Sequence, residues 1–434
     1  MKRFGWRVLV FITIFVAGFS IGLHSPINEI FRGGRFHLTK VLFQAESKTI
    51  VSPVAEHDLP EIFSHSLTTT NANKLSKSLE LEELKTVPPE IFPVGWYDTI
   101  RHPQTPAKVS GEGINILMPY ITGDLSDERV FRYLDAAEEA GVKVLLEVRR
   151  SLVESGNNLG VQNFVNTFKN HPAIFGWHLY DEPDHKKFSP SILKQLYNSI
   201  KSVDSLHPVA IVFAWYTGMV KYRDAMDIFM FDYYPCKYDL PEFGGFSGNR
   251  FQQFLQRASS YGSSEEAFWF VMQGFGEKSD GTPQANRRLP TVAEARYMFY
   301  TAITTPVDGL FFWTHYRTQQ SWIDSTLTPL IKEFYENFTA ISNRVQVGKI
   351  SSDREDIQVN LYQDLDTEDY LIVAIHHGED TITSEIRLSQ EILGNFATKL
   401  GNYLSLYPIK NQNFIDVFEP YAVHLYKIDS SNSR

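Results

Sequence analysis

The chain contains very little cysteine and no block of positive charge. Cys236 is the only cysteine among 434 residues, which excludes an intramolecular disulfide and a cysteine-based metal cluster. The 13 histidines form no His-x-x-x-His or His-Glu-x-x-His pattern, so a zinc hydrolase has no support and no cofactor is expected. Lysine and arginine occur in no run longer than a pair, and the formal net charge is −10. Because nucleic acids bind to positively charged surfaces, a nucleic-acid partner is not expected.

The N-terminal segment has the pattern of an export signal. Basic side chains within residues 1–7 precede an apolar stretch from Val8 to Leu23. No Ala-x-Ala cleavage pattern follows, and the stretch is short for a full membrane span. We therefore expect residues 1–24 to be either a cleaved signal peptide or a signal anchor that tethers the chain through residues 8–23. In both cases the protein is exported, and is extracellular, periplasmic or membrane-anchored.

Residues 25–89 lack sustained hydrophobic periodicity. Within them, residues 64–78 are polar and rich in Ser, Thr and Asn, which compete with helix formation. We predict that residues 25–89 form a flexible tether.

From residue 90 onward, short apolar runs alternate with helical periods. This alternation is typical of a parallel α/β sheet or barrel, and eight strand–helix units within residues 90–345 match the size of a TIM (β/α)8 barrel. The helix expected over Asp127–Ala140 has one apolar stripe and ends at Gly141. The expected strands are Phe92–Tyr97, Ile114–Pro119, Val142–Glu147, Ile174–Asp181, Val209–Ala214, Ile228–Asp232, Phe268–Gln273 and Gly309–Thr314.

After a further helix, the hydrophobic period changes to two. Alternation of this kind is typical of antiparallel strands with one buried face. The expected strands are Ile357–Gln363, Tyr370–His376, Thr381–Leu388, Tyr403–Tyr407 and Tyr421–Ile428. The sequence therefore predicts a fold of the α/β class, a TIM barrel followed by a small antiparallel β-sandwich domain over residues 350–430.

Polar and aromatic residues follow the apolar runs of the barrel. The fourth strand ends in Asp181-Glu182-Pro183, where the proline prevents the strand from continuing. Reactive groups of TIM barrels collect at the carboxyl ends of the strands, and desolvation there raises the pKa of a carboxylic acid. Carboxylates surrounded by Trp and Tyr suit a carbohydrate, whose hydroxyls need acceptors and whose ring faces need apolar platforms.

Four motifs carry a resemblance to a known group: Phe92-Pro-Val-Gly-Trp-Tyr97, the stretch from His171 through Gly176-Trp177 to Asp181-Glu-Pro183, Asp232-Tyr-Tyr-Pro235, and Phe312-Trp313. From Phe92 to Trp313 the chain resembles the clan-A glycoside hydrolases, and among them the β-galactosidase-like enzymes with an Asp-Glu-Pro fourth strand. The resemblance implies that Glu182 is the general acid/base and that Trp313 lines a sugar subsite.

The chain departs from this group at two positions. Asp181 stands where the group has Asn before the acid/base. Gln273 stands at the end of strand seven, where the group has its nucleophilic Glu, and an amide cannot attack an anomeric carbon as a carboxylate does. Glycoside hydrolysis normally requires two carboxyl groups. We rank Asp232 and Glu277 together as the second catalytic carboxylate, ahead of Glu147.

The remaining residues at the strand ends are predicted to contact the sugar. The predicted substrate-binding residues are Trp96, Tyr97, Glu147, Asp181, Tyr233, Gln273 and Trp313.

Three functions fit this pattern. The first is an exported glycoside hydrolase, retaining or inverting, that acts on an oligo- or polysaccharide. The second, favoured by Gln273, is a barrel that binds glycans without cleaving them. The third is a membrane-tethered scaffold in polysaccharide synthesis or export. The spacing between Glu182 and a second carboxylate discriminates the first from the second.

Overall fold

The structure is a computed structural model that describes residues 92–429 except 122–124, 238–244, 263–265, 277–286, 338–340, 342–349, 365–366, 391, 393 and 402–404. The predicted signal segment and tether, residues 1–24 and 25–89, and the predicted catalytic residue Glu277 lie outside this part of the chain. Within the described residues, no helix has the length and hydrophobicity needed to cross a membrane.

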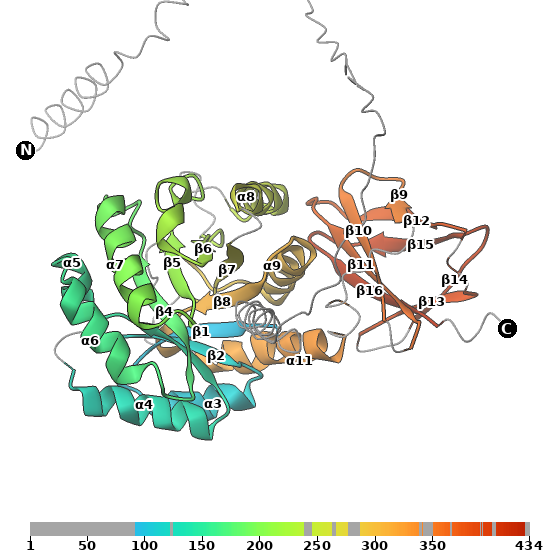
Figure 1. Cartoon of the computed structure of the whole chain (residues 1–434). Helices are drawn as coiled ribbons and strands as arrows, with labels where there is room; N and C mark the ends of the chain where they lie inside the picture. The colour runs from blue at the N-terminus through green and yellow to red at the C-terminus, as the bar shows by residue number, and fades with distance from the viewer. Residues whose placement is uncertain are drawn as a thin grey trace, which may run out of the picture. The chain divides into compact units, whose positions relative to one another are not determined.

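Eight parallel strands form a closed barrel in which each strand pairs with its neighbours in sequence and β1 pairs with β8 (Figure 1). Each predicted strand overlaps one of them, and the predicted fold class is confirmed. The strands are β1 (Val94–Thr99), β2 (Ile116–Tyr120), β3 (Lys143–Glu147), β4 (Ile174–Asp181), β5 (Val209–Phe213), β6 (Ile228–Asp232), β7 (Ala267–Gln273) and β8 (Gly309–Trp313).

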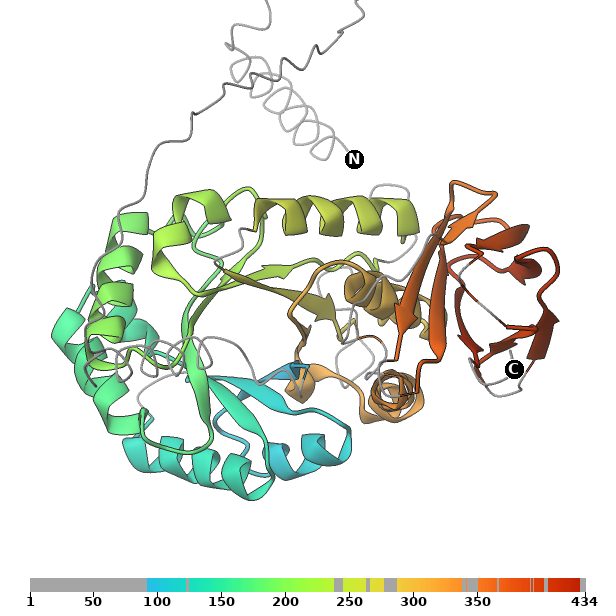
Figure 2. The same cartoon turned by 45° about the vertical axis from the view of Figure 1, so that its right-hand side comes forward.

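Helices surround the strands as an outer layer (Figure 2). The β5–β6 connection differs from the others, because it contains two short 3₁₀ helices, η2 (Met219–Lys221) and η3 (Arg223–Ala225), where a regular unit has an α-helix. A capping box formed by Thr291 and Glu294 opens α9. The α-helices are α3 (Thr105–Gly111), α4 (Asp127–Glu139), α5 (Arg150–Glu154), α6 (Asn158–Phe168), α7 (Pro190–Val203), α8 (Gly248–Tyr261), α9 (Val292–Thr304), α10 (Gln320–Trp322) and α11 (Thr328–Glu336); η4 (His315–Arg317) and the π-helical turn η5 (Ile323–Leu327) follow β8.

Side chains of the barrel strands alternate between the barrel interior and the surrounding helices. In β6, Met230 belongs to the interior cluster, whereas Phe231 belongs to the outer core. Because successive side chains of a strand point to opposite faces, Asp232 points inward at the carboxyl end of the strand. The alternation continues past the strand, since Tyr233 packs against the outer core and Tyr234 against the interior cluster.

Two antiparallel sheets follow the barrel, one of five strands and one of three. Buried residues of both sheets, such as Ile372 and Phe414, belong to one hydrophobic cluster, as in a β-sandwich. The prediction missed β9, β13 and β15, which are short or carry exposed hydrophobic residues such as Ile415. The strands are β9 (Ile350–Ser352), β10 (Ile357–Gln363), β11 (Tyr370–His376), β12 (Ile382–Leu388), β13 (Phe396–Lys399), β14 (Ser405–Pro408), β15 (Asn413–Phe418) and β16 (Val423–Ile428).

Helix α9 connects the barrel to the five-stranded sheet, and it lies between the barrel strands and β11 in Figure 1. Residues Tyr297–Ile303 are all buried, on every side of the helix. A helix that is apolar all round must be covered all round. Here barrel strands cover one side and the sheet covers the other, and the Tyr297 hydroxyl lies 2.6 Å from Nδ1 of His377.

Candidate active site

Strand β4 delivers Glu182 to the carboxyl end of the barrel. The backbone N–H of Glu182 donates to the carbonyl of Val212 in β5 at 2.8 Å, and Pro183 then ends the strand. The backbone of Glu182 has φ of 54°, a left-handed conformation that costs about 1–3 kcal/mol for a residue with a side chain. Such strain concentrates at functional sites, where the surrounding structure holds the residue in place.

The carboxyl groups of Glu182 and Asp232 form a hydrogen bond with each other. Burial raises the pKa of Asp232 well above its usual range, and the negative charges of Glu182 and Asp181 raise it further. The pKa of Glu182 is raised too, first by burial and then by Asp181. Since two carboxylates in contact cannot both ionise readily, the pair retains one shared proton above the usual pKa of a carboxyl group.

Two further carboxylates flank the pair. Asp181 forms an ion pair with Lys186, with Oδ2 and Nζ 3.4 Å apart. Asp184 accepts hydrogen bonds from the backbone N–H groups of Ala214 at 3.3 Å and Trp215 at 2.8 Å. The loops that follow β4 and β5 are therefore joined through the side chain of Asp184.

Three tyrosines, the buried Tyr97 and the partly buried Tyr120 and Tyr234, lie close to these carboxylates. Tyr234 forms a side-chain hydrogen bond to Asp232, and Tyr97 and Tyr120 interact electrostatically with Asp181. Burial raises the pKa of all three hydroxyls well above the usual range, so they remain neutral donors. Tyr97 is only 1% exposed, and therefore lies beneath the carboxylates rather than in direct reach of a ligand.

Glu147 lies at the end of β3, next to these groups. Its carboxylate accepts a hydrogen bond from the backbone N–H of Ile121 and lies 3.7 Å from the guanidinium of Arg150. Burial raises the pKa of Glu147 to about 7, against the lowering effect of the Ile121 N–H. Glu147 therefore keeps its proton to a much higher pH than an exposed glutamate does.

Trp313 ends β8 and belongs to the inner side of the barrel. Its indole Nε1 lies 3.3 Å from the hydroxyl of Tyr120, and Phe275 packs edge-on against its ring with the centroids 4.6 Å apart. The guanidinium of Arg317 lies 5.1 Å from the ring centroid. The ring is partly exposed, and its role as a sugar platform stays a prediction.

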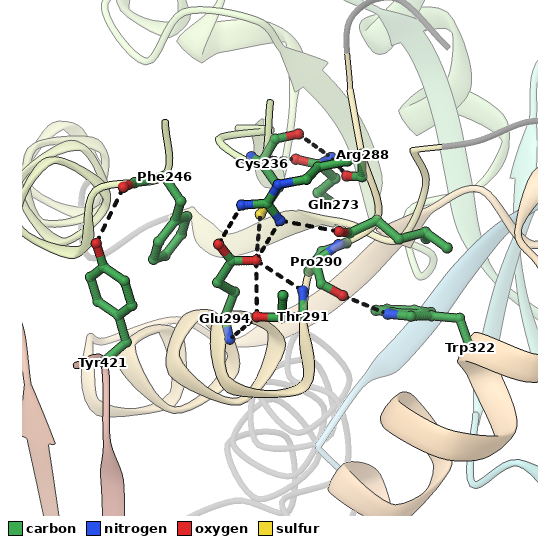
Figure 3. Close-up of polar contacts among 10 residues, drawn as sticks. Cys236, Phe246, Gln273, Arg288, Pro290, Thr291, Glu294, Trp322 and Tyr421 are labelled. Carbon is green, nitrogen blue, oxygen red and sulfur yellow. Dashed lines mark hydrogen bonds and ion pairs between the residues drawn. The ribbon is translucent and has the colours of Figure 1, made fainter. Parts of the chain in front are cut away.

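Gln273 has no free amide group with which to contact a substrate (Figure 3). Its Oε1 accepts from the N–H of Cys236 at 2.8 Å, and its Nε2 lies 2.8–3.0 Å from the carbonyls of Cys236, Phe275 and Arg288. The Arg288 guanidinium is in turn held by both oxygens of Glu294 at 2.6 Å. The predicted contact of Gln273 with the sugar is therefore wrong. Its side chain instead connects the loops that follow β6 and β7 by hydrogen bonds.

The predicted sugar contacts of Trp96 and Tyr233 are also wrong, because both side chains point out of the barrel. Trp96 is completely buried in the outer core and packs against Phe312 and His315. Tyr233 stacks on Phe254 of α8, with ring centroids 4.8 Å apart. In both cases the neighbouring residue, Tyr97 or Tyr234, has the inward orientation.

The prediction missed three aromatic residues near the carboxylates. Tyr120 and Tyr234 are found by the two-residue alternation of the strands. Trp215 is the third: its side chain is 59% exposed, although its backbone is fixed by Asp184 at the carboxyl end of β5. An exposed tryptophan directly after a strand was the available signal.

Among residues 92–429, outside the gaps, no group of three or more His, Cys, Asp or Glu side chains is arranged to hold a metal ion.

Comparison with known proteins shows which solved structures share this fold. No protein-family model matches the sequence, and no curated protein matches it. Among solved structures, the chain is similar to a glycoside hydrolase at 12% identity, covering 79% of this chain and 93% of that one, with a TM-score of 0.54. A family 5 glycoside hydrolase from Bacteroides vulgatus is 13% identical, with 79% and 89% covered and a TM-score of 0.55. A family 39 glycoside hydrolase from Bacteroides cellulosilyticus is 10% identical, with 79% and 81% covered and a TM-score of 0.50. The chain has the barrel fold of these proteins.

Proposed function

We propose that this protein is a glycoside hydrolase in which Glu182 and Asp232 are the two catalytic carboxyl groups. The observation that carries the proposal is the hydrogen bond between them at the carboxyl end of the barrel. Hydrolysis of a glycosidic bond needs one protonated and one ionised carboxyl group, and a pair that shares one proton supplies both. The fold, common to several glycoside hydrolases, supports the same conclusion by analogy.

We assign the proton transfer to Glu182, which is held at the strand end by its backbone hydrogen bond to Val212. In the first step, Asp232 attacks the anomeric carbon while the proton of the pair passes through Glu182 to the departing oxygen. In the second step, Glu182 accepts a proton from water, which displaces Asp232. Hydrogen-bonded carboxyl groups are closer than the spacing of about 5–5.5 Å in retaining enzymes and the spacing of about 6.5–9.5 Å in inverting ones, so the pair must separate when a sugar binds. Because the retaining spacing needs the smaller movement, the proposed outcome is retention.

The proposed substrate is an oligo- or polysaccharide. Trp313 offers an apolar face on the β8 side of the pair, and Trp215 offers another on the β5 side. Asp181 offers an acceptor for sugar hydroxyls, whereas Glu147, only 4% exposed, lies beneath the site like Tyr97. Two aromatic platforms at different strands suit consecutive sugar rings better than a single ring.

The test is hydrolysis by Glu182→Gln, measured on a panel of α- and β-linked aryl glycosides and polysaccharides. Loss of general acid catalysis lowers kcat by about 10²–10⁴-fold, while Glu139→Gln on the exposed face of α4 serves as the matched control. Unchanged turnover in Glu182→Gln removes the assignment. If the wild-type protein binds glycans in an array but cleaves none, the non-hydrolytic barrel is the correct function. NMR of the first anomer released decides between retention and inversion.

We also propose that the protein is exported, on the strength of the basic and apolar segments within residues 1–24. Fractionation of cells that express the tagged full chain tests this. Release into the medium or periplasm indicates cleavage, whereas recovery with membranes indicates an anchor and also keeps the scaffold function open.

A further inference from the structure

Three basic side chains lie together on the segments that follow β6 and β7, at the carboxyl end of the barrel. Lys237 follows β6 and forms an antiparallel backbone bridge with Arg287, which follows β7. Arg250 lies in the first turn of α8, where its N–H donates to the N-cap side chain of Ser247. We refer to Lys237, Arg250 and Arg287 as the cation cluster.

The members of the cation cluster repel one another. The pKa of Lys237 is lowered by burial and then by the charges of Arg287 and Arg250, and burial lowers the pKa of Arg287 as well. Among the described residues, no carboxylate forms an ion pair with any of the three. The N-terminal end of α8 adds a partial positive charge. Like charges placed together repel one another, and an anionic ligand would offset this repulsion.

The cluster is rigidly linked to the catalytic pair. Gln273 binds the backbone at Cys236 and Arg288, the residues next to Lys237 and Arg287, and the N–H of Arg288 donates to the carbonyl of Cys236 at 3.2 Å. The hydroxyl of Tyr234 interacts electrostatically with Arg287 and forms a hydrogen bond to Asp232. Arg287 also interacts with Tyr233, which points out of the barrel, so Tyr234 is the residue that connects the cluster to Asp232.

We propose that the cation cluster binds an anionic substituent of the substrate, a carboxylate or a sulfate, so that the glycan cleaved by this protein is an acidic oligo- or polysaccharide. Arginine binds such groups with two parallel hydrogen bonds, and lysine binds them as a point charge. This inference rests on the proposed function and narrows its substrate class. The protein itself is acidic, with a net charge of −10, so this local concentration of positive charge is not part of a general basic surface.

The test measures binding of the full-length protein to acidic polysaccharides and to their neutral forms. The carboxylate arm uses polygalacturonate, alginate and hyaluronan, each beside its carboxyl-reduced form. The sulfate arm uses dextran sulfate beside dextran. The triple variant Lys237→Gln, Arg250→Gln, Arg287→Gln is compared with Lys108→Gln, Arg129→Gln, Arg132→Gln, which removes the same charge from exposed positions of α3 and α4.

The expected result is that at least one acidic polymer binds more tightly than its neutral form. The triple variant should lose this preference, with affinity for the acidic polymer reduced about tenfold or more, whereas the control variant keeps it. The arm that responds identifies the carboxylate or the sulfate as the ligand. Equal binding of acidic and neutral forms, equal loss in both variants, or stronger binding of a short single-stranded oligonucleotide overturns the inference.

The binding test is independent of catalysis. Glu182→Gln should keep the preference for the acidic polymer, because the cluster does not include Glu182. Hydrolysis of neutral glycans without an acidic preference overturns the inference alone, whereas acidic binding without any hydrolysis by the wild-type protein overturns the proposed function alone.

Discussion

The carboxyl groups of Glu182 and Asp232 form a hydrogen bond although their strands are not neighbours in the barrel, since β5 lies between β4 and β6. The two groups meet because Glu182 follows β4 in a left-handed conformation and Asp232 points inward at the end of β6. The pair titrates as a unit, and its protonation determines both the proposed chemistry and the response of the fold to pH.

Asp232→Asn should abolish the proposed hydrolysis and change how stability depends on pH. In the folded protein, burial and the charge of Glu182 raise the pKa of Asp232 well above its ordinary value of 3.8. The folded state therefore keeps a proton that the unfolded chain releases, and stability falls as the pH rises above about 4 toward the raised pKa. Asparagine does not titrate, so the variant should be more stable than the wild type at high pH and lose this advantage in acid. Urea unfolding at several pH values measures the difference, and parallel curves for the two proteins contradict the assigned pKa.

Glu147→Gln should remove a second contribution to the pH dependence of stability, over a narrower pH range. The carboxyl group titrates near pH 7 in the folded protein instead of 4.5, so the wild type loses stability over this interval, by about 3 kcal/mol at most. Glutamine retains an acceptor for the Ile121 N–H and has no charge to bury. The variant should gain in melting temperature relative to the wild type at pH 8, with no gain at pH 4. An equal gain in melting temperature at pH 4 and at pH 8 would show that packing, not protonation, is responsible.

Gln273→Glu should destabilise the fold without creating a nucleophile. The carboxylate would face the carbonyl oxygens of Cys236, Phe275 and Arg288, which now accept from the amide. A buried group left without its partner costs about 1–3 kcal/mol, and a charged group costs more. We expect a lower melting temperature and hydrolysis no faster than that of the wild type. Gln273→Ala is the control, because it removes the same hydrogen bonds without adding a charge. Faster hydrolysis by Gln273→Glu would mean that this side chain can reach the substrate.

Trp215→Ala should affect long substrates and leave short ones unchanged. The exposed indole contributes little to folding, so the melting temperature should remain within about 1 °C of the wild type. Loss of one sugar platform, worth about 1–1.5 kcal/mol, raises KM for a long oligosaccharide about tenfold. An aryl monoglycoside should keep its kinetics. Leu206→Ala, which removes an apolar side chain with 48% exposure, is the control, and an equal effect on both substrates contradicts the assignment.

Local sequence patterns were sufficient to predict the barrel strands and the residue at which β4 ends. Apolar runs and the proline stop are properties of adjacent residues, so they can be read without a structure. The strand period of two would also have favoured Tyr234 over Tyr233, because Tyr234 lies two residues after Asp232 and therefore points to the same side of the strand.

Other features depend on contacts that sequence does not record. The amide of Gln273 binds Cys236, 37 positions earlier, and Arg288, 15 positions later. The partnership of Glu182 and Asp232 arises from barrel closure, which brings the ends of nonadjacent strands to a common rim. Strand-end residue type alone indicated several candidates and could not select among them.

The burial of α9 on every side has a practical consequence for anyone who wishes to shorten this protein. Tyr297–Ile303 would lose half of their cover if the chain ended near residue 345, and a band of aromatic and aliphatic side chains would face water. The sandwich that follows the barrel is thus an integral wall of the hydrolase proposed here, and the smallest piece expected to stay in solution extends to the end of β16.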